Sequence, residues 1–313
     1  IKMSNISQVD QAAHGIWKYH KLFPEVPKEF WLSLNEGNTP VVEKEGIFFK
    51  REDQNPTGSL KDRGLSYQIS KAHSLGKQDL VISSSGNAAI SAASYCNLAG
   101  IKLHVFVSPK IKEGKVKEIA KSGAQIHKGL RPVSSAIRYA KENDFLNLRP
   151  SVGDEGWVGY QTISFELNQE LGKIDNIFIP VSSGTALVGI NKGFEKIGYL
   201  PQVHFVQTTA VCPIASLFDH SFESSNSSIA DALIAKAVPR KDEIVEIVKK
   251  SGGFGWVVSD LEIESAGKKL DSWQISTSAE GAAALAGIYK AKENGKNLGE
   301  KIVCLLTGKN YGF

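Results

Sequence analysis

From residue 79 onward, short apolar runs rich in β-branched residues alternate with helical patterns, and this alternation constrains the fold more than any other feature. The runs are "DLVIS" (79–83), "KLHVFV" (102–107), "DNIFIPV" (175–181), "QVHFVQTT" (202–209) and "EKIVCLLTG" (300–308). Helical patterns such as "AAISAASYCNLAG" (88–100) and "AEGAAALAGIYKAKENG" (279–295) lie between them. Continuous apolar strands joined by helices are typical of parallel sheets that are buried on both faces. The sequence therefore predicts an α/β fold with two doubly wound lobes and mainly parallel sheets.

The composition is that of a globular chain and excludes several classes of protein. The 313 residues exceed one typical domain, and 42% of them are hydrophobic. The net charge of +4 is too small and too evenly spread to indicate nucleic-acid binding. Three cysteines without a C-x-x-C pair favour neither a disulfide framework nor a metal site. Because there is no run of 18 apolar residues and no apolar leader, we expect a cytoplasmic protein without a membrane span.

Three turns rich in small residues follow predicted strands. They are Ser83-Ser84-Ser85-Gly86-Asn87, Ser182-Ser183-Gly184-Thr185 and Thr307-Gly308. In doubly wound sheets, ligands bind beyond the carboxyl ends of the strands. The first two turns open helices, whose N-termini favour anions. The chain has no Walker loop and no G-x-G-x-x-G fingerprint, so neither a P-loop nucleotide nor a nicotinamide site is indicated.

The stretch "NPTGSLKDRG" (55–64) places Lys61 after a turn and at the start of a predicted helix. One interpretation is a loop followed by a solvated helix start. The other is that the Lys61 amine does covalent chemistry. A reactive amine combined with two anion-binding turns suits pyridoxal 5'-phosphate (PLP), which carries a phosphate, an aldehyde and a pyridine nitrogen. Its amino-acid substrate carries a carboxylate, which would occupy the second anion site.

Several collinear motifs resemble the fold-type II PLP-dependent enzymes and, within them, threonine synthases. "GNTPVV" and "FFKREDQNPTGSLKDRG" resemble the family's entry strand and lysine motif, and "SSSGNAAISAASYCNLAG" resembles its substrate-carboxylate loop and helix. Later segments resemble the family in the same order: "SPKIKEGKVKEIAKSGAQI", "HFVQTTAVCPI", "SGGFGWVVSDLEI" and "SAEGAAALAGI". The resemblance covers nearly the whole chain beyond about residue 30. It implies a tryptophan synthase beta-like fold, a PLP cofactor, a small amino-acid substrate and a homodimer.

The resemblance also implies roles for individual residues. Lys61 would be the Schiff-base lysine, and Asn87 would bond the phenolic oxygen of PLP. Thr307 would bond the pyridine nitrogen, and its neutral hydroxyl would leave proton transfers to Lys61. Ser84 and Ser85 would bind the substrate carboxylate. The loop that would hold the cofactor phosphate consists of Ser182, Ser183, Gly184 and Thr185.

The chain departs from the threonine synthase pattern where the phosphate of the substrate would bind. The family has an arginine in the segment that reads "DEGWVGYQT" here, and Gly156 occupies its position, beside Trp157, which would add an apolar face. A threonine of the carboxylate loop is replaced by Ala88. Three cations are candidates to compensate for the arginine: Lys115, which falls on a Gly-Lys pair of the family pattern, Arg149 and Lys309.

Three functions are therefore open. The first is a threonine synthase-like lyase that converts O-phosphohomoserine and water to threonine and phosphate. The second is another fold-type II reaction: serine or threonine ammonia-lyase, β-replacement or racemisation. The third is a non-catalytic PLP-fold binding protein, against which the presence of both the lysine and the phosphate loop argues.

Composition marks no domain border. We expect a large cofactor-binding domain of residues 1–53 and 156–313, and a small domain of residues 54–155 that carries the substrate-carboxylate loop. The Ser-rich stretch "HSFESSNSSIADA" (220–232) is expected to form a surface loop that leads into a helix capped near Ser228.

Overall fold

The computed structural model describes residues 9–148, 155–235 and 238–311. The chain folds into two compact units. The large unit consists of Asn38–Gln54 and the described part of Gln161–Tyr311, and the small unit consists of residues 9–37 and the described part of Asn55–Tyr160. Each unit contains one sheet in which neighbouring strands are mainly parallel, as the alternation of strands and helices predicts.

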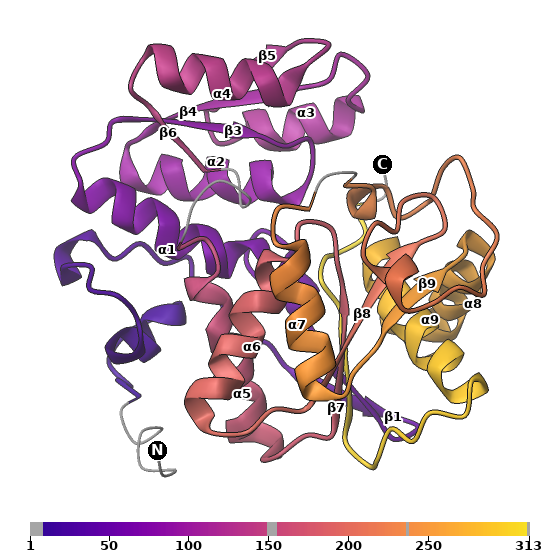
Figure 1. Cartoon of the computed structure of the whole chain (residues 1–313). Helices are drawn as coiled ribbons and strands as arrows, with labels where there is room; N and C mark the ends of the chain where they lie inside the picture. The colour runs from indigo at the N-terminus through magenta and orange to yellow at the C-terminus, as the bar shows by residue number, and fades with distance from the viewer. Residues whose placement is uncertain (1–8, 149–154, 236–237, 312–313) are drawn as a thin grey trace. The chain divides into compact units, whose positions relative to one another are not determined.

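The small unit is a four-stranded parallel sheet covered by helices on both faces. Its strands run in the order β5 (Gln125–Lys128), β4 (Lys102–Val107), β3 (Asp79–Ser83) and β6 (Leu146–Asn147). Its α-helices are α1 (Lys61–Ser74), α2 (Asn87–Ala99), α3 (Glu113–Ala120) and α4 (Pro132–Glu142). Figure 1 shows α2 and α4 on opposite sides of β3 and β4. The strand order turns around at β3, which is the arrangement that places a ligand site beyond the end of β3.

The N-terminal segment packs in the small unit, whereas the sequence analysis grouped it with the large domain. It contains the 3₁₀ helices η2 (Gly15–Leu22) and η3 (Lys28–Phe30). The rings of Trp17 and Trp31 stack with their centroids 5.0 Å apart, and Trp17 also contacts Tyr67 of α1. Aromatic side chains bury large apolar areas, so this cluster attaches the segment to α1. The hydrophobic pattern of strands and helices carries no signal for such a contact.

The large unit is a six-stranded sheet. Its strands run in the order β1 (Val41–Lys44), β2 (Ile47–Lys50), β10 (Ile302–Leu305), β7 (Asn176–Pro180), β8 (Gln202–Thr208) and β9 (Gly255–Val258). All neighbouring pairs are parallel except the β1–β2 hairpin. Its α-helices are α5 (Gln161–Leu171), α6 (Thr185–Ile197), α7 (Lys241–Ser251), α8 (Asp260–Ser272) and α9 (Ala279–Glu293). Figure 1 shows α6 and α7 on one side of the sheet and α8 and α9 on the other.

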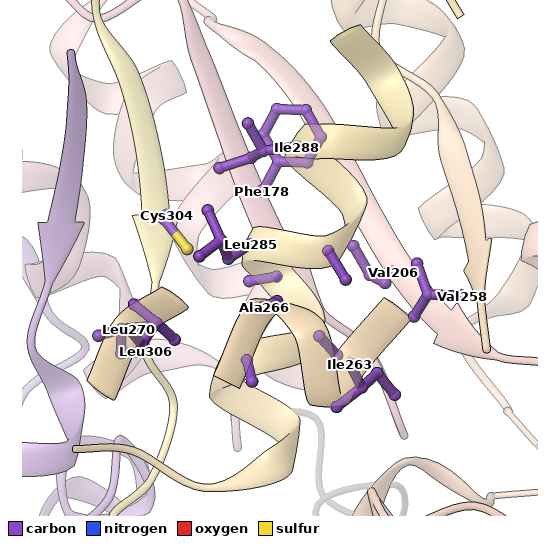
Figure 2. Packing of buried hydrophobic residues seen from close by; sticks show 14 of the residues in the cluster. Phe178, Val206, Val258, Ile263, Ala266, Leu270, Leu285, Ile288, Cys304 and Leu306 are labelled. Carbon is purple, nitrogen blue, oxygen red and sulfur yellow. The ribbon is translucent and has the colours of Figure 1, made fainter. Parts of the chain in front are cut away.

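The core of the large unit lies between α8, α9 and one face of the sheet. Figure 2 shows Leu285 and Ile288 of α9 packed over Phe178 and Cys304, with Ile263 of α8 nearby. Helix α9 is rich in alanine, and its Gly287 lies so close to β8 that a Cβ there would approach Val206 Cγ2 to 2.5 Å. Small residues thus let α9 lie directly on the sheet. This helix and the strands beneath it are among the elements that the sequence pattern predicts.

The Ser-rich stretch differs from its expectation. In the described residues 229–235 no α-helix follows Ser228; a single turn of 3₁₀ helix, η7 (Asp231–Leu233), occurs instead, and α7 begins at Lys241. The Ser228 hydroxyl donates a hydrogen bond to Asp260 Oδ1 (2.7 Å), so it holds the loop against the start of α8. Within the described ranges, no helix is both long and apolar enough to cross a membrane.

His204 of β8 lies in the core of the large unit and predicts a dependence of stability on pH. Trp256 Nε1 can only donate, so its bond to Nδ1 (3.2 Å) leaves Nε2 to donate to Asn176 Oδ1 (2.8 Å). This neutral form has no place for a second proton, and burial lowers the pKa of His204 from 6.5 to about 3. Since the unfolded chain takes up a proton below about pH 6.5 and the folded chain does not, His204 stabilises the fold fully above that pH and progressively less below it.

We expect the stability advantage of the wild type over His204→Gln to shrink by about 1.4 kcal/mol per pH unit between about pH 6 and 4. Wild type and variant must be compared because burial also raises the pKa of Asp62 to about 6. Asp62 therefore makes the free energy of unfolding change with pH in the opposite direction, and it does so in both proteins, so the contribution cancels in the difference. Urea unfolding at a series of pH values measures the difference. A difference that stays constant with pH would show that His204 accepts a proton in the fold.

Candidate functional site

Lys61 is the first residue of α1 and follows a tight turn. Gly58 adopts φ +83°, a backbone conformation that favours glycine, and its N–H donates to Asn55 O (2.7 Å). The hydroxyl of Ser59 accepts a bond from the backbone N–H of Lys61 (3.3 Å). The small and polar residues before the lysine therefore form the turn that starts the helix.

The Lys61 side chain is half-buried beside the ring of Tyr160. Its Nζ lies 5.8 Å from the ring centroid, within reach of a cation–π interaction. Tyr160 can approach because residue 64, one turn along α1, is glycine: a Cβ there would lie 2.6 Å from the ring. Burial lowers the pKa of Lys61 from 10.5 to about 8. A larger fraction of this amine is therefore uncharged and nucleophilic near neutral pH.

The turn after β3 leads directly into α2, which begins at Asn87. The Ser84 hydroxyl accepts from Gly86 N–H (3.3 Å), and Ser85 lies between them. A Cβ on Gly86 would meet open space among the described atoms, so the backbone of this turn is accessible to a ligand. Helix starts also leave backbone N–H groups without helical partners. The turn can therefore bind an anion such as a carboxylate.

The starts of α1 and α2 lie beside each other in the small unit. Ser91, one turn after Asn87, donates a hydrogen bond from its hydroxyl to Asp62 Oδ1 (2.6 Å), next to Lys61. The structure thus brings the predicted lysine and the predicted carboxylate turn together. Neither Asp62 nor Ser91 was predicted as a site residue from the sequence, because a hydrogen bond between two helices leaves no mark in the local sequence pattern.

In the large unit, the other two small-residue turns occupy neighbouring positions at one edge of the sheet. Strands β7 and β10 are adjacent and parallel, so their carboxyl ends share that edge. The turn 181–184 follows β7, and Thr307 follows β10. Thr307 is 9% exposed, and the adjacent Gly308 carbonyl accepts from Thr277 Oγ1 (2.9 Å) and Ser278 N–H (2.8 Å).

The turn after β7 has the geometry of an anion-binding helix start. Gly184, the residue before the 13-residue helix α6, adopts φ +79°. The hydroxyls of Ser183 and Thr185 lie 3.3 Å apart on either side of it, and Ser182 is half-buried. Hydroxyls and backbone N–H groups thus converge at the positive end of the α6 dipole. A side chain at Gly184 would be strained by its φ and would meet Ile244 Cδ1 at 2.1 Å, so this glycine is also required by the fold.

Gln207 of β8 supports this turn, and the sequence analysis did not identify it. Its Oε1 accepts from the backbone N–H of Ile214 (3.0 Å) and Ala215 (2.9 Å), and its Nε2 faces Val181 O at 3.5 Å. The side chain is fully buried. A buried glutamine within a run of apolar strand residues is the signal that could have indicated it, since a buried amide needs partners.

The candidates for the substrate phosphate belong to different elements of the two units. Gly156 faces Gln68 of α1, whose Nε2 would lie 3.5 Å from a Cβ at residue 156, and Trp157 packs against the N-terminal aromatic cluster. Lys115 is half-exposed on α3, in the small unit. Lys309 is exposed in the large unit, with Nζ 4.4 Å from the centroid of the Tyr311 ring. Arg149 lies outside the described residues.

Comparison with known proteins identifies the protein family to which the chain belongs. Residues 32–308 match the family described as pyridoxal-phosphate dependent enzyme. The chain belongs to this family, and its cofactor is PLP. The resemblance inferred from the motifs is thereby confirmed at the level of the family.

Individual relatives show which members of the family the chain resembles. The chain is 30% identical to the threonine synthase of Methanosarcina acetivorans, over 94% of this chain and 79% of that protein. It is 28% identical to the threonine synthase of Methanocaldococcus jannaschii, over 94% and 80%. Among solved structures, maize serine racemase superposes with a TM-score of 0.78 at 22% identity (88% of this chain, 90% of that one). Threonine deaminase isoform 2 from Solanum lycopersicum gives 0.77 at 20% identity (92% and 87%). These structures confirm the predicted tryptophan synthase beta-like fold.

Proposed function

We propose that this enzyme is a threonine synthase-like lyase that converts O-phosphohomoserine and water to threonine and phosphate. The observation that carries the proposal is the similarity to threonine synthases along 94% of the chain. The presence of Lys61 and the carboxylate turn in the small unit, and of the hydroxyl-rich turn before α6 in the large unit, supports it, because the reaction needs a reactive amine and sites for anions.

The residues of the chain fit PLP. The α6 start, with its hydroxyls and left-handed Gly184, suits a phosphate, and Thr307, just beyond the end of the adjacent strand β10, would bond the pyridine nitrogen. In the small unit, Lys61 would hold the aldehyde and Asn87 would bond the phenolic oxygen. When bound, PLP withdraws electrons from the Cα of an amino acid joined to it. We therefore assign these residues to the cofactor.

Lys61 would also move the protons. An amine whose pKa is lowered to about 8 can both take and return a proton near neutral pH. The ring of Tyr160 covers one side of Nζ and limits access of water there. The turn of Ser84, Ser85 and Gly86 would bind the substrate carboxylate through hydroxyls and backbone N–H groups.

We also propose that the protein is a homodimer, as the family resemblance implies. A measurement of its mass in solution tests this proposal.

A second candidate is a serine or threonine ammonia-lyase, and Gly156 favours it. A departing phosphate dianion needs a strong cationic partner, for which a bidentate arginine is suited. At Gly156 that side chain is absent, and the neutral amide of Gln68 is the neighbour. If the substrate is phosphorylated, one of the three candidate cations, Lys115, Arg149 or Lys309, would have to supply the charge.

Analysis of the products formed by the PLP-loaded enzyme distinguishes the threonine synthase-like lyase from the ammonia-lyase. We expect phosphate and threonine from O-phosphohomoserine. We further expect Lys115→Ala to raise KM and lower kcat together by about tenfold each, because an anion bound in both the ground state and the transition state would lose its partner. Lys117→Ala, two positions further from the α3 start and exposed, is the control. Keto acid and ammonia from serine or threonine, without phosphate or threonine from O-phosphohomoserine, would support the ammonia-lyase instead.

The turn before α6 (residues 181–184), which would bind the cofactor phosphate, gives a separate prediction. In a Ser182→Ala, Ser183→Ala double variant we expect the Kd for PLP to rise at least about tenfold, because hydrogen bonds to a charged group are lost. Stability without PLP should change little, because both side chains are partly exposed. Ser259→Ala is the matched control: it removes the capping box of α8 and should cost about 1 kcal/mol of stability while leaving PLP affinity unchanged. Equal PLP affinity in wild type and double variant would place the phosphate elsewhere.

A further inference from the structure

One face of α2 carries a row of polar side chains that begins at the candidate site and is buried from Ser91 onward. Asn87, Ser91 and Tyr95 are spaced four residues apart, so they lie on the same side of the helix. Ser91 donates to Asp62 Oδ1 (2.6 Å), and Tyr95 donates to Glu36 Oε2 (2.7 Å). The exposed fraction of each of these four bonded side chains is zero. Two buried carboxylates thus hold α2 along this face.

Asp62 accepts more hydrogen bonds than an acidic residue requires to stabilise the first turn of a helix. Besides the Ser91 hydroxyl, it accepts the backbone N–H of Thr57 at Oδ2 (2.7 Å) and the Thr57 hydroxyl at Oδ1. Burial raises the pKa of Asp62 to about 6, and the three donors oppose that rise, so the carboxyl is mainly ionised at neutral pH. An ionised carboxylate accepts all three bonds at once, whereas a protonated one would turn a proton toward a donor.

Through these hydrogen bonds, the Asp62 side chain connects three segments of the small unit. Thr57 belongs to the turn before Lys61, Asp62 is the residue after it, and Ser91 lies one turn beyond Asn87. The backbone around Lys61 is therefore fixed on both sides, and it is fixed to the helix whose start carries Asn87 and the carboxylate turn. The Glu36–Tyr95 bond differs, because it fixes the N-terminal segment through Ile16 N–H (3.3 Å) and Leu34 N–H (3.0 Å).

We propose that Asp62, with Thr57 and Ser91, is a positioning group that sets the Lys61 amine relative to Asn87 and the turn before it. The inference rests on the proposed roles of Lys61 and Asn87. Proton transfer is sensitive to the placement of the donor, so a small displacement of α1 against α2 lowers the rate even when both helices remain folded.

Two variants that delete one buried hydroxyl from the same helix test this. Ser91→Ala removes a bond to Asp62, and Tyr95→Phe removes the equivalent bond to Glu36, so both lower stability through the loss of one bond to a carboxylate. The readout is exchange of the α-hydrogen of L-serine, L-threonine and O-phosphohomoserine in deuterated water by the PLP-loaded enzyme. We expect exchange at saturating amino acid to fall about tenfold in Ser91→Ala and to stay within about twofold in Tyr95→Phe.

A second pair covers the case in which Ser91→Ala does not fold. Thr57→Val removes the hydroxyl at nearly constant shape and should lower exchange about tenfold, while Thr57→Ser keeps the hydroxyl and should retain the wild-type rate. Equal losses in Ser91→Ala and Tyr95→Phe, or in Thr57→Val and Thr57→Ser, overturn the positioning role and leave Asp62 a purely structural acid. Exchange that persists in Lys61→Ala, or is absent in the wild type, instead overturns the proposed function and this inference with it.

Discussion

Lys61→Ala is expected to abolish turnover, with a loss of at least about 10³-fold in kcat. The reason is that one amine is assigned both the bond to the cofactor aldehyde and the subsequent proton transfers, so its removal eliminates two functions. The half-buried side chain carries no salt bridge in the described structure, so the variant should remain folded. The measurement is the steady-state rate of product formation at saturating PLP and substrate.

The control for this variant is Lys71→Ala on the same helix. Lys71 lies nearly three turns from the start of α1, and its Nζ contacts Glu25 O at 3.3 Å. Its removal should leave kcat within about twofold, since surface substitutions have small effects. A Lys61→Ala enzyme that retains a tenth or more of the wild-type rate would contradict the assignment of Lys61 as the reactive amine.

Gly159→Ala is expected to have the largest effect on stability, about 2–4 kcal/mol, together with loss of Lys61 chemistry. Gly159 lies in η5 (Val158–Tyr160), against the first turn of α1. A Cβ there would lie 1.9 Å from the backbone oxygen of Arg63, and a backbone atom in a helix cannot rotate away as a side chain does. The segment would have to separate from α1, and Tyr160 would move from Lys61.

The matched control is Gly129→Ala in the same unit. A Cβ at Gly129 meets open space among the described residues, so the same chemical change should alter stability by less than about 0.5 kcal/mol. Urea unfolding curves and PLP binding of both variants test the prediction. Wild-type stability in Gly159→Ala would mean that η5 does not contact α1 as closely as described.

The fold could be predicted because its signals are local. Each strand of the alternating pattern, such as β3, β7 and β10, is a continuous apolar run, and α9 ends at a glycine stop. The turns of the candidate site were also found from sequence, because small residues after strands are required where a backbone approaches a ligand. The topology then brings the β7 and β10 turns to one edge of a sheet.

The supporting residues could not be predicted in the same way. Asp62 and Ser91 are 29 positions apart, and Gln207 of β8 contacts Val181 at the end of the neighbouring strand β7. Each of these residues alone is compatible with a helix or strand in any globular protein. The placement of the N-terminal segment depended on a stack of Trp17 on Trp31, for which periodicity gives no sign. Contacts between elements, rather than the elements themselves, were the missing information.

The most direct test of the account is to reduce the PLP-loaded wild-type protein with borohydride and map the labelled peptide. The account predicts that pyridoxyl phosphate is fixed to a single peptide, at Lys61, because this amine combines lowered pKa with a helix start next to the carboxylate turn. Label on any other lysine, or a protein that takes up PLP but cannot be labelled, would contradict it.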